Sequence, residues 1–342
     1  MQGLSQYCLW LYLKQQIMRS EIMHPSEIKI LLGLSLQVDR LVSEQGVFKL
    51  FNEIPFHKLS NEHELVEYIN FTGFLKAPFT VSSLHKAEEY LNKHLSLGIV
   101  PIPFGDNKYP VCLAITPNPP AMLYVKGDVN ILNEMPGVAI VGSRDVSAAG
   151  EEITKRITKK ICEMGLVIVS GLAIGTDTNA HKATLNAKAK TIAVLAHGLE
   201  IAKPKQNARL ANDILNNGGA WISEYPVGRP AFKQSFVQRN RIQVGLSAVS
   251  ILIEAAKNSG TMTQADFAIK ALRPIFAVVP HKPDNPLGLN CEGTQQLVDN
   301  EQAKPLRTSQ DYDDLLAVIS NSIDRIKVNS DIYSTNVNNY LF

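Results

Sequence analysis

The stretch GVAIVGSR at residues 137–144 decides the fold, because a short apolar run ends there in glycine, serine and arginine. Similar runs recur towards the C-terminus, each followed by a segment with apolar residues at helical spacing. The predicted strands are 138–141, 167–169, 191–195, 220–223, 249–253 and 275–279. The predicted helices are 149–164, 178–187, 206–216, 236–245 and 264–271. This alternation predicts an α/β fold with a parallel sheet that helices cover on both faces.

The flanking segments differ in pattern from this core. Upstream, residues 27–42, 62–68 and 83–97 have apolar residues at helical spacing, with Ser83 as the expected N-cap of the last helix. The proline-punctuated residues 101–120 are interpreted as a linker. Downstream of Arg307, one helix is expected at 312–326, followed by a frayed end. The expected organisation is therefore a small helical N-terminal domain (1–100), a sheet domain (101–306) and a short tail (307–342).

Composition excludes several classes of protein. The chain has 342 residues, 45% of them apolar and 19% charged, which argues against a disordered or fibrous protein. No uncharged apolar run approaches the roughly 18 residues of a membrane helix. The apolar segment at 7–13 has no basic residues before it and no cleavage site after it, so no signal peptide is expected. Four scattered cysteines, with no C-x-x-C pair, indicate a reducing cytoplasm and no zinc site.

Charge is concentrated in one part of the chain. The net charge is only +2, yet residues 203–241 contain seven basic and two acidic side chains. This excess suggests an anionic partner at one face. A solvated charged surface is the commoner explanation for any single charged run, and it remains open here.

Three predicted strands end in small polar residues. The first ends in Gly142, Ser143 and Arg144, the second in Ser170 and Gly171, and the third in His197 and Gly198. Ligands of parallel sheets bind at the carboxyl ends of strands, where glycines and helix N-termini favour phosphate. A single turn of this kind is more often only a tight connection. Three such turns at one edge of the sheet make phosphate binding about as good an explanation as tight connections.

The first turn excludes two common nucleotide sites. Arg144 occupies the place of the second glycine of G-x-G-x-x-G, and no acid follows Ser170 for a ribose hydroxyl, so NAD or FAD is not expected. The chain also has no P-loop motif, and no cofactor is predicted. A guanidinium at a strand end suits a phosphate monoester or diester, which it can grip with two parallel hydrogen bonds.

The helix that begins near residue 236 is basic at its start. It contains Arg239, Asn240 and Arg241. The two arginines are separated by about 200° around a helix, so they cannot share a face. One is expected to face a ligand and the other to pair with a carboxylate such as Glu224 or Glu254. Asp177 and His181 are one turn apart, but no third ligand is evident, so a structural role is favoured over a metal site or a general base.

Taken together, these segments resemble the DNA-processing protein A family of bacteria (DprA, also called Smf). The resemblance spans roughly residues 98–306. It is carried by 109–110, 119–120, 124–128, 141–144, 168–173, 191–195, 222–224, 239–242, 254–255, 259–261, 276–278, 293–294 and 297–298. Departures from the family pattern include Glu200 for aspartate, Lys203 for tyrosine and Val237 for proline. The C-terminal winged helix of some members is also missing, which indicates a divergent member.

The resemblance implies an extended Rossmann-like, doubly wound and mostly parallel sheet that binds single-stranded DNA without known catalysis. It further implies a homodimer that passes incoming DNA to the RecA recombinase during natural transformation. Arg144 and Lys205 match basic positions of the family's DNA pocket. The expected DNA-binding residues are Gly142, Ser143, Arg144, Ser170, Gly171, Lys205, Asn207, Arg239, Asn240 and Arg241.

Aromatic residues near the basic stretch are candidates for base stacking. Tyr225 and Phe232 are expected in a loop and able to stack, whereas Trp221 and Phe236 are expected in the core.

Two other classes of function remain open. The sheet also resembles nucleoside-monophosphate phosphoribohydrolases, which have an essential glutamate where this chain has Gln264. An amide cannot stabilise a developing oxocarbenium ion as a carboxylate does, so no enzyme activity is expected. Glu254 is the nearest substitute, but it is expected to anchor an arginine. A nucleotide-sensing module on the same sheet is the third class.

Overall fold

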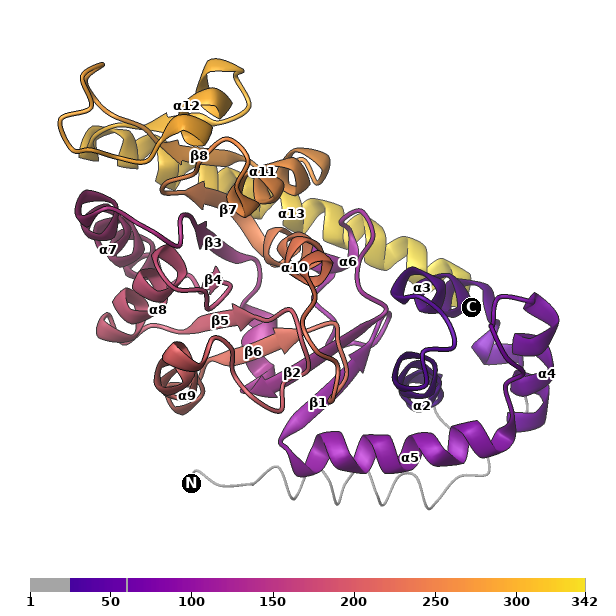
Figure 1. The fold of residues 1–342 in the computed structure, drawn as a ribbon. Coiled ribbons are helices and arrows are strands. Elements are labelled where there is room, and N and C mark those ends of the chain that lie inside the picture. Colours follow the sequence, from indigo (N-terminus) through magenta and orange to yellow (C-terminus); the bar gives the residue numbers. More distant parts are fainter. Residues whose placement is uncertain (1–24, 60, 342) are drawn as a thin grey trace, which may run out of the picture.

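The computed structural model describes residues 25–59 and 61–341 of the chain (Figure 1). The apolar segment at 7–13 and Cys8 lie outside these residues. The described part forms one nine-stranded sheet with the order β1-β2-β6-β5-β4-β3-β7-β8-β9. Strands β3 to β9 are parallel to one another, and only the β1–β2 and β2–β6 pairs are antiparallel. The predicted mostly parallel, Rossmann-like α/β sheet is confirmed.

The six predicted strands all form, within two residues at each end. They are β3 (Gly137–Val141), β4 (Ile168–Ser170), β5 (Thr191–Val194), β6 (Ala220–Ser223), β7 (Ser247–Leu252) and β8 (Ile275–Val278). Their side chains are buried throughout, as expected for strands that are covered on both faces.

Three further strands were not predicted. They are β1 (Ile99–Pro103), β2 (Met122–Gly127) and the short edge strand β9 (Lys304–Leu306). The interpretation of 101–120 as only a linker is wrong at its start, because Pro101 and Pro103 lie within β1. Proline is tolerated there because β1 is an edge strand that pairs with β2 alone.

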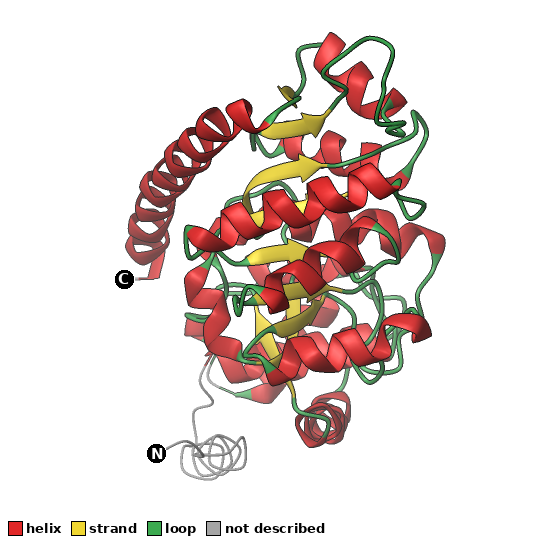
Figure 2. Cartoon of the chain, turned by 90° about the vertical axis from the view of Figure 1, so that its left-hand side faces the viewer, coloured by secondary structure: helices red, strands yellow, loops and turns green. Residues whose placement is uncertain are grey.

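Helices cover both faces of the sheet (Figure 2). Those within the sheet domain are α6 (Val111–Ala114), α7 (Ala148–Glu163), α8 (Thr176–Asn186), α9 (Ala208–Asn216), α10 (Lys233–Gly245), α11 (Gly260–Lys270) and α12 (Glu292–Asp299). The five predicted helices are present, but α10 and α11 begin three and four residues earlier than expected. These earlier starts bring Lys233 and Gly260 into the helices that face the candidate site.

The N-terminal helices pack directly on the antiparallel side of the sheet. They are α2 (Pro25–Val38), α3 (Glu44–Glu53), α4 (Glu62–Thr72) and α5 (Val81–Ser96). Their apolar side chains share one buried cluster with Leu195 and Trp221 of the sheet domain. The N-cap of α5 is Thr80, whose side chain accepts from the Ser83 backbone N–H, so the assignment of Ser83 as N-cap is wrong.

The C-terminal helix α13 (Tyr312–Leu341) packs against β7. Leu315, Ile319 and Ile326 are buried, and the Ser322 hydroxyl donates to the carbonyl of Ala248. The predicted end of the helix near Ile326 is wrong. Ile326 is close to the end of the buried face, but residues 327–341 contain no glycine or proline to stop the helix. The helix therefore extends past the sheet (Figure 2).

Candidate functional site

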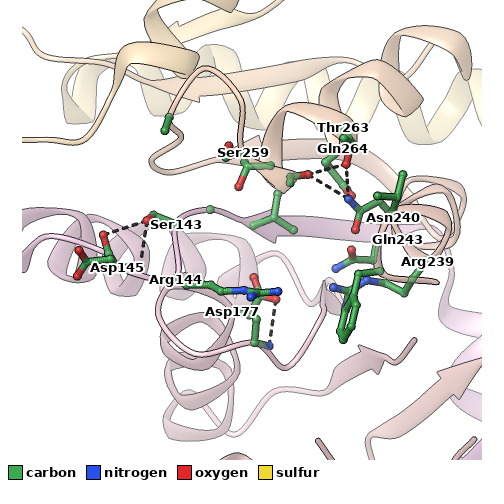
Figure 3. Close-up of a pocket in the computed structure, with 18 of the residues that line it drawn as sticks. Ser143, Arg144, Asp145, Asp177, Arg239, Asn240, Gln243, Ser259, Thr263 and Gln264 are labelled. Atoms are coloured by element: carbon green, nitrogen blue, oxygen red, sulfur yellow. Dashed lines mark hydrogen bonds between the residues drawn. The ribbon is translucent and has the colours of Figure 1, made fainter. Parts of the chain in front are cut away.

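A cavity of about 750 Å³ opens at the carboxyl ends of β3 and β7 (Figure 3). The chain leaves β3 towards β4 on one side and returns to β7 on the other, so this is the point where the strand order reverses. Open α/β sheets bind ligands at such switch points. The walls come from the loop after β3, from one face of α10 and from the start of α11.

The loop after β3 is tightly built. The Ser143 hydroxyl donates to the Asp145 carbonyl at 2.9 Å and accepts from the Asp145 N–H at 3.1 Å. A Cβ at Gly142 would lie 2.6 Å from Thr176 Oγ1, so a larger residue there would push the loop away from α8. This packing holds Arg144 at the mouth of the cavity. Arg144 is exposed and has no ion-pair partner among the described residues.

Arg239 forms the floor of the cavity from α10. Its guanidinium is buried and donates from Nη1 to the Val194 carbonyl at 2.6 Å. It lies against Gly171, where any Cβ would overlap the guanidinium. Burial lowers the pKa of Arg239, whereas the Asp177 carboxylate raises it and Arg144 lowers it further. Figure 3 shows Arg144, Asp177 and Arg239 converging on the same space.

Asp177 is held by the backbone rather than by a ligand. Its Oδ2 accepts from the N–H groups of Gly171 at 3.1 Å and Ala173 at 3.2 Å. Burial raises the pKa of this carboxyl, while Arg239 and these hydrogen bonds lower it. His181 does not approach it as a second catalytic group, because its Nδ1 bonds to Thr191 Oγ1 at 2.8 Å. Burial lowers the pKa of His181 to about 3, so the ring is neutral.

One face of α10 lines the cavity with Phe236, Arg239, Asn240 and Gln243. This is the i, i+3, i+4, i+7 spacing of a single helical face. The side chain of Asn240 donates to the Gly260 carbonyl at 3.2 Å and to Thr263 Oγ1 at 2.9 Å, which ties α10 to α11. The spacing from Arg239 could have identified Gln243 and Phe236 from the sequence, but both were missed as site residues.

Arg241 lies on the opposite face of α10 and outside the cavity lining. It forms a two-pronged ion pair with Glu224, with Nη1–Oε1 at 2.9 Å and Nη2–Oε2 at 2.6 Å. Its Nε donates to the Asn118 carbonyl. Burial lowers the pKa of Arg241, but Glu224, together with Tyr225 and Tyr109, raises it overall. The expectation that one of the two arginines pairs with a carboxylate such as Glu224 is confirmed for Arg241, and a ligand contact of Arg239 stays a prediction.

The remaining sequence-predicted residues also lie outside the cavity lining. The Ser170 hydroxyl is buried and donates to the Ile140 carbonyl at 2.7 Å. Asn207 donates to the Leu172 carbonyl and to Thr178 Oγ1, both at 2.8 Å. Lys205 is exposed at the start of the short helix η3 (Lys205–Asn207). The structure therefore brings together Gly142, Ser143, Arg144, Arg239 and Asn240 at the cavity, with Gly171 beneath Arg239.

Glu254 does not anchor an arginine, so that expectation is wrong. Its carboxylate accepts from the N–H and hydroxyl of Ser147, at 2.9 and 2.6 Å, and from the Asn290 N–H at 3.1 Å. It therefore fixes the N-cap of α7 to the loop that precedes α12. Gln264 lines the cavity as a buried amide, with its Nε2 at 3.4 Å from Ser250 Oγ.

Trp221 and Phe232 are placed as predicted, in the core and in the open respectively, whereas Tyr225 and Phe236 are not. Trp221 and Tyr225 are buried, so Tyr225 does not stack from an open loop as expected. Phe232 is 51% exposed and Phe236 is 40% exposed, so the placement of Phe236 in the core is wrong. The Arg144 guanidinium lies 6.0 Å from the Phe236 ring, and that of Arg229 lies 5.7 Å from the Phe232 ring. Phe236 is thus an open ring in the cavity lining, and Phe232 is a second open ring at the N-cap of α10.

The described part of the chain has neither a metal-binding cluster nor a membrane-spanning helix. Within residues 25–59 and 61–341, no three His, Cys, Asp or Glu side chains gather closely enough to hold a metal ion. No helix in these ranges combines the length and apolar character needed to cross a bilayer.

The chain is similar in sequence to a family of DNA-processing proteins. Residues 101–318 match the model of the family described as DNA recombination-mediator protein A. DNA processing protein DprA of Bacillus subtilis is 37% identical over 193 residues, which cover 56% of this chain and 65% of that protein. Protein Smf of Escherichia coli is 38% identical, over 61% of this chain and 53% of that protein. The chain thus spans between half and two thirds of the length of these two relatives.

Solved structures extend the similarity to the fold. The structure of DprA from Streptococcus pneumoniae superposes with a TM-score of 0.57 at 28% identity, covering 90% of this chain and 97% of that one. A structure of DNA processing protein A from Helicobacter pylori, reported for its single-stranded DNA binding mode, has a TM-score of 0.55 at 30% identity. It covers 64% of this chain and 95% of that one.

Proposed function

This chain belongs to the DNA recombination-mediator protein A family, and from that premise we propose that it binds single-stranded DNA at the cavity between α10 and α11. We place this activity in DNA processing during natural transformation, in the cytoplasm. There the protein would protect incoming DNA and help to load RecA, and it would act as a homodimer. Relatives named for DNA processing and a similar protein reported to bind single-stranded DNA support the proposal.

The observation that carries the proposal is the combination of cations and an open aromatic ring in one hollow. Arg144, Lys233 and Arg239 line the cavity together with the exposed ring of Phe236. Single-strand binding requires cationic groups along the backbone and flat side chains on which unpaired bases stack. A base held in a duplex is already stacked and paired, so it cannot turn into the hollow to stack on this ring, and the geometry favours single strands.

Two buried carboxylates at or near the cavity, Asp177 and Glu254, are bound by the protein itself, which supports a binding role. Gln264 provides an amide where related hydrolases have a glutamate. The oxygens of Glu254 accept three hydrogen bonds from the chain, and Asp177 accepts two from the backbone. These two carboxylates hold loops in place through hydrogen bonds within the protein.

A binding titration tests the proposal. The protein should bind a single-stranded oligonucleotide more tightly than the matching duplex, with little dependence on sequence. The logarithm of the affinity should fall with the logarithm of salt concentration by about 0.7 per phosphate neutralised. Equal affinity for duplex, or affinity that salt does not change, would exclude this function. Mixing the DNA-bound protein with purified RecA, and measuring its mass in solution, tests the proposed partner and the dimer.

A further inference from the structure

The loop that follows β6 is held by side chains of the N-terminal helices. It spans residues 224–232 and leads into α10, one face of which lines the cavity. Gln37, on α2, donates from Nε2 to the Glu224 carbonyl at 3.3 Å. His94, on α5, accepts at Nε2 from the Val227 N–H at 2.9 Å. Two hydrogen bonds thus join the helical domain to the backbone of this loop.

The ring of His94 is oriented as an acceptor for this bond. Its Nδ1 lies 2.7 Å from the Tyr90 carbonyl, which can only accept, so Nδ1 carries the proton and Nε2 offers a lone pair. Burial lowers the pKa of His94 and Lys93 lowers it further, whereas the Tyr90 carbonyl and Glu200 raise it. The net effect is a lowered pKa, which keeps the ring neutral at pH 7. The ring also stacks on Tyr124 of β2, with centroids 5.1 Å apart.

Gln37 is oriented in the same way by its neighbours. Its Oε1 accepts from the Tyr124 hydroxyl, so its amide nitrogen faces the Glu224 carbonyl and the Glu44 carboxyl group. Gln37 is 5% exposed and His94 is 1% exposed. Hydrogen bonds are directional, so buried polar side chains of this kind fix the position of a loop more closely than apolar contacts do.

The loops at the carboxyl ends of the strands differ in what holds them. The loop after β4 is fixed from within the sheet domain, by hydrogen bonds to Asp177. The loop after β6 is joined to the loop after β5 through Glu200, but two of its backbone groups have their partners in α2 and α5. A shift of the N-terminal helices would therefore move this loop, and with it Lys233 at the start of α10, which lines the cavity.

We infer that Gln37 and His94 are positioning residues for DNA binding, which hold the loop after β6 and the start of α10 where the bound strand requires them. The residues that line the cavity lie between Val141 and Gln264, so α2 and α5 act on it through the loop. The N-terminal helical domain thereby sets the affinity of a site that lies in the sheet domain. The inference rests on the proposed function, because it concerns the binding of the same strand.

The test measures the affinity of full-length variants for oligothymidylate. His94→Phe keeps a ring that can stack on Tyr124 but offers no acceptor to the Val227 N–H. It should weaken binding roughly 3- to 10-fold, the value of about one net hydrogen bond. His94→Gln offers an amide oxygen in place of Nε2 and should restore most of the affinity, which a role in packing alone does not predict. Gln37→Leu should also weaken binding, because it removes the donor to the Glu224 carbonyl.

His85→Phe is the matched control, since His85 is an exposed histidine on the same helix, and it should bind like the wild type. A folded His94→Phe protein with wild-type affinity, or a loss that His94→Gln does not restore, would overturn the inference. If the variants do not fold, amide hydrogen exchange of the wild type decides. Because coupling is reciprocal, the bound strand should slow exchange in α2 and α5 as well as in the loop. Slower exchange in the sheet domain alone would overturn the inference. If the wild type does not bind oligothymidylate, the proposed function itself fails.

Discussion

The two faces of α10 use neighbouring arginines in opposite ways. On the far face, Arg241 and Glu224 satisfy each other, and Asn118 takes a further hydrogen bond. On the cavity face, Arg144 has no ion-pair partner among the described residues, and Arg239, Gln243 and Gln264 each keep an unused polar atom. Both regions are rich in polar groups, so polarity alone does not mark a site. The difference lies in whether the protein already satisfies those groups.

The largest expected effect is a loss of stability when the ion pair between Arg241 and Glu224 is removed. Glu224 is 3% exposed and Arg241 is 12% exposed in their ion pair. Arg241→Ala should lower the free energy of unfolding by about 3–5 kcal/mol, because it leaves a buried carboxylate uncompensated. Denaturant unfolding measures this change. Arg156→Ala, which removes an exposed ion pair with Glu152, should cost less than about 1 kcal/mol. Equal losses for the two variants would contradict the contrast between the faces.

The second largest expected effect is on DNA binding, when a cation at the cavity is removed. Arg144→Ala should weaken binding of single-stranded DNA by about tenfold or more, since a hydrogen bond to a charged group contributes about 1.5–3 kcal/mol. Thermal stability should change little, because Arg144 is exposed. Lys205→Ala should also weaken DNA binding, but by less, since Lys205 lies outside the cavity lining. Unchanged dissociation constants for both variants would show that DNA does not bind at the cavity.

A third prediction concerns pH at the junction of the N-terminal helices and the sheet. Burial, then the charge of Glu224, raises the pKa of Glu44 to about 7, from 4.5 as an isolated group. The folded state therefore binds an extra proton between these values, so this group destabilises the fold progressively as pH rises from 4.5 to 7. Glu44→Gln removes this penalty.

The Glu44→Gln variant should consequently have a higher melting temperature than the wild type above pH 7. The difference between the two should be smaller near pH 5. Glu67→Gln, at an exposed position of α4, is the control and should show no such pH dependence. A difference between Glu44→Gln and wild type that stays constant from pH 5 to 8 would contradict the raised pKa.

The last prediction is that the protein does not hydrolyse nucleoside monophosphates. The protein should release no ribose 5-phosphate from AMP, GMP or CMP, because Gln264 cannot stabilise the positive charge that develops on the ribose. A sensitive assay for ribose 5-phosphate checks this. Release well above background that disappears in Glu254→Gln would identify an enzyme, and the Arg144 end of the cavity would then hold a substrate phosphate.

Local patterns in the sequence were enough to predict the six strands β3 to β8 and five of the helices between them. Six strands and five helices are placed where apolar spacing puts them, because burial on one or both faces leaves a periodic signal along the chain. The pairing of β1 with β2 was missed, since two prolines hide an edge strand in a stretch typical of a linker.

The sequence by itself also determined the family that the chain resembles and one of the strand ends that form the cavity, whereas Ser170, Gly171, His197 and Gly198 at the other two predicted strand ends lie outside the cavity lining. Carboxyl ends of parallel strands meet at one edge, so Gly142, Ser143 and Arg144 could be placed there without a structure. Only the tertiary structure decided that Arg239 faces the cavity while Arg241 meets Glu224, and that Glu254 binds Ser147 rather than an arginine. The reason is that a side chain's partners come from segments distant in sequence, and pairing consumes the same groups that would otherwise bind a ligand.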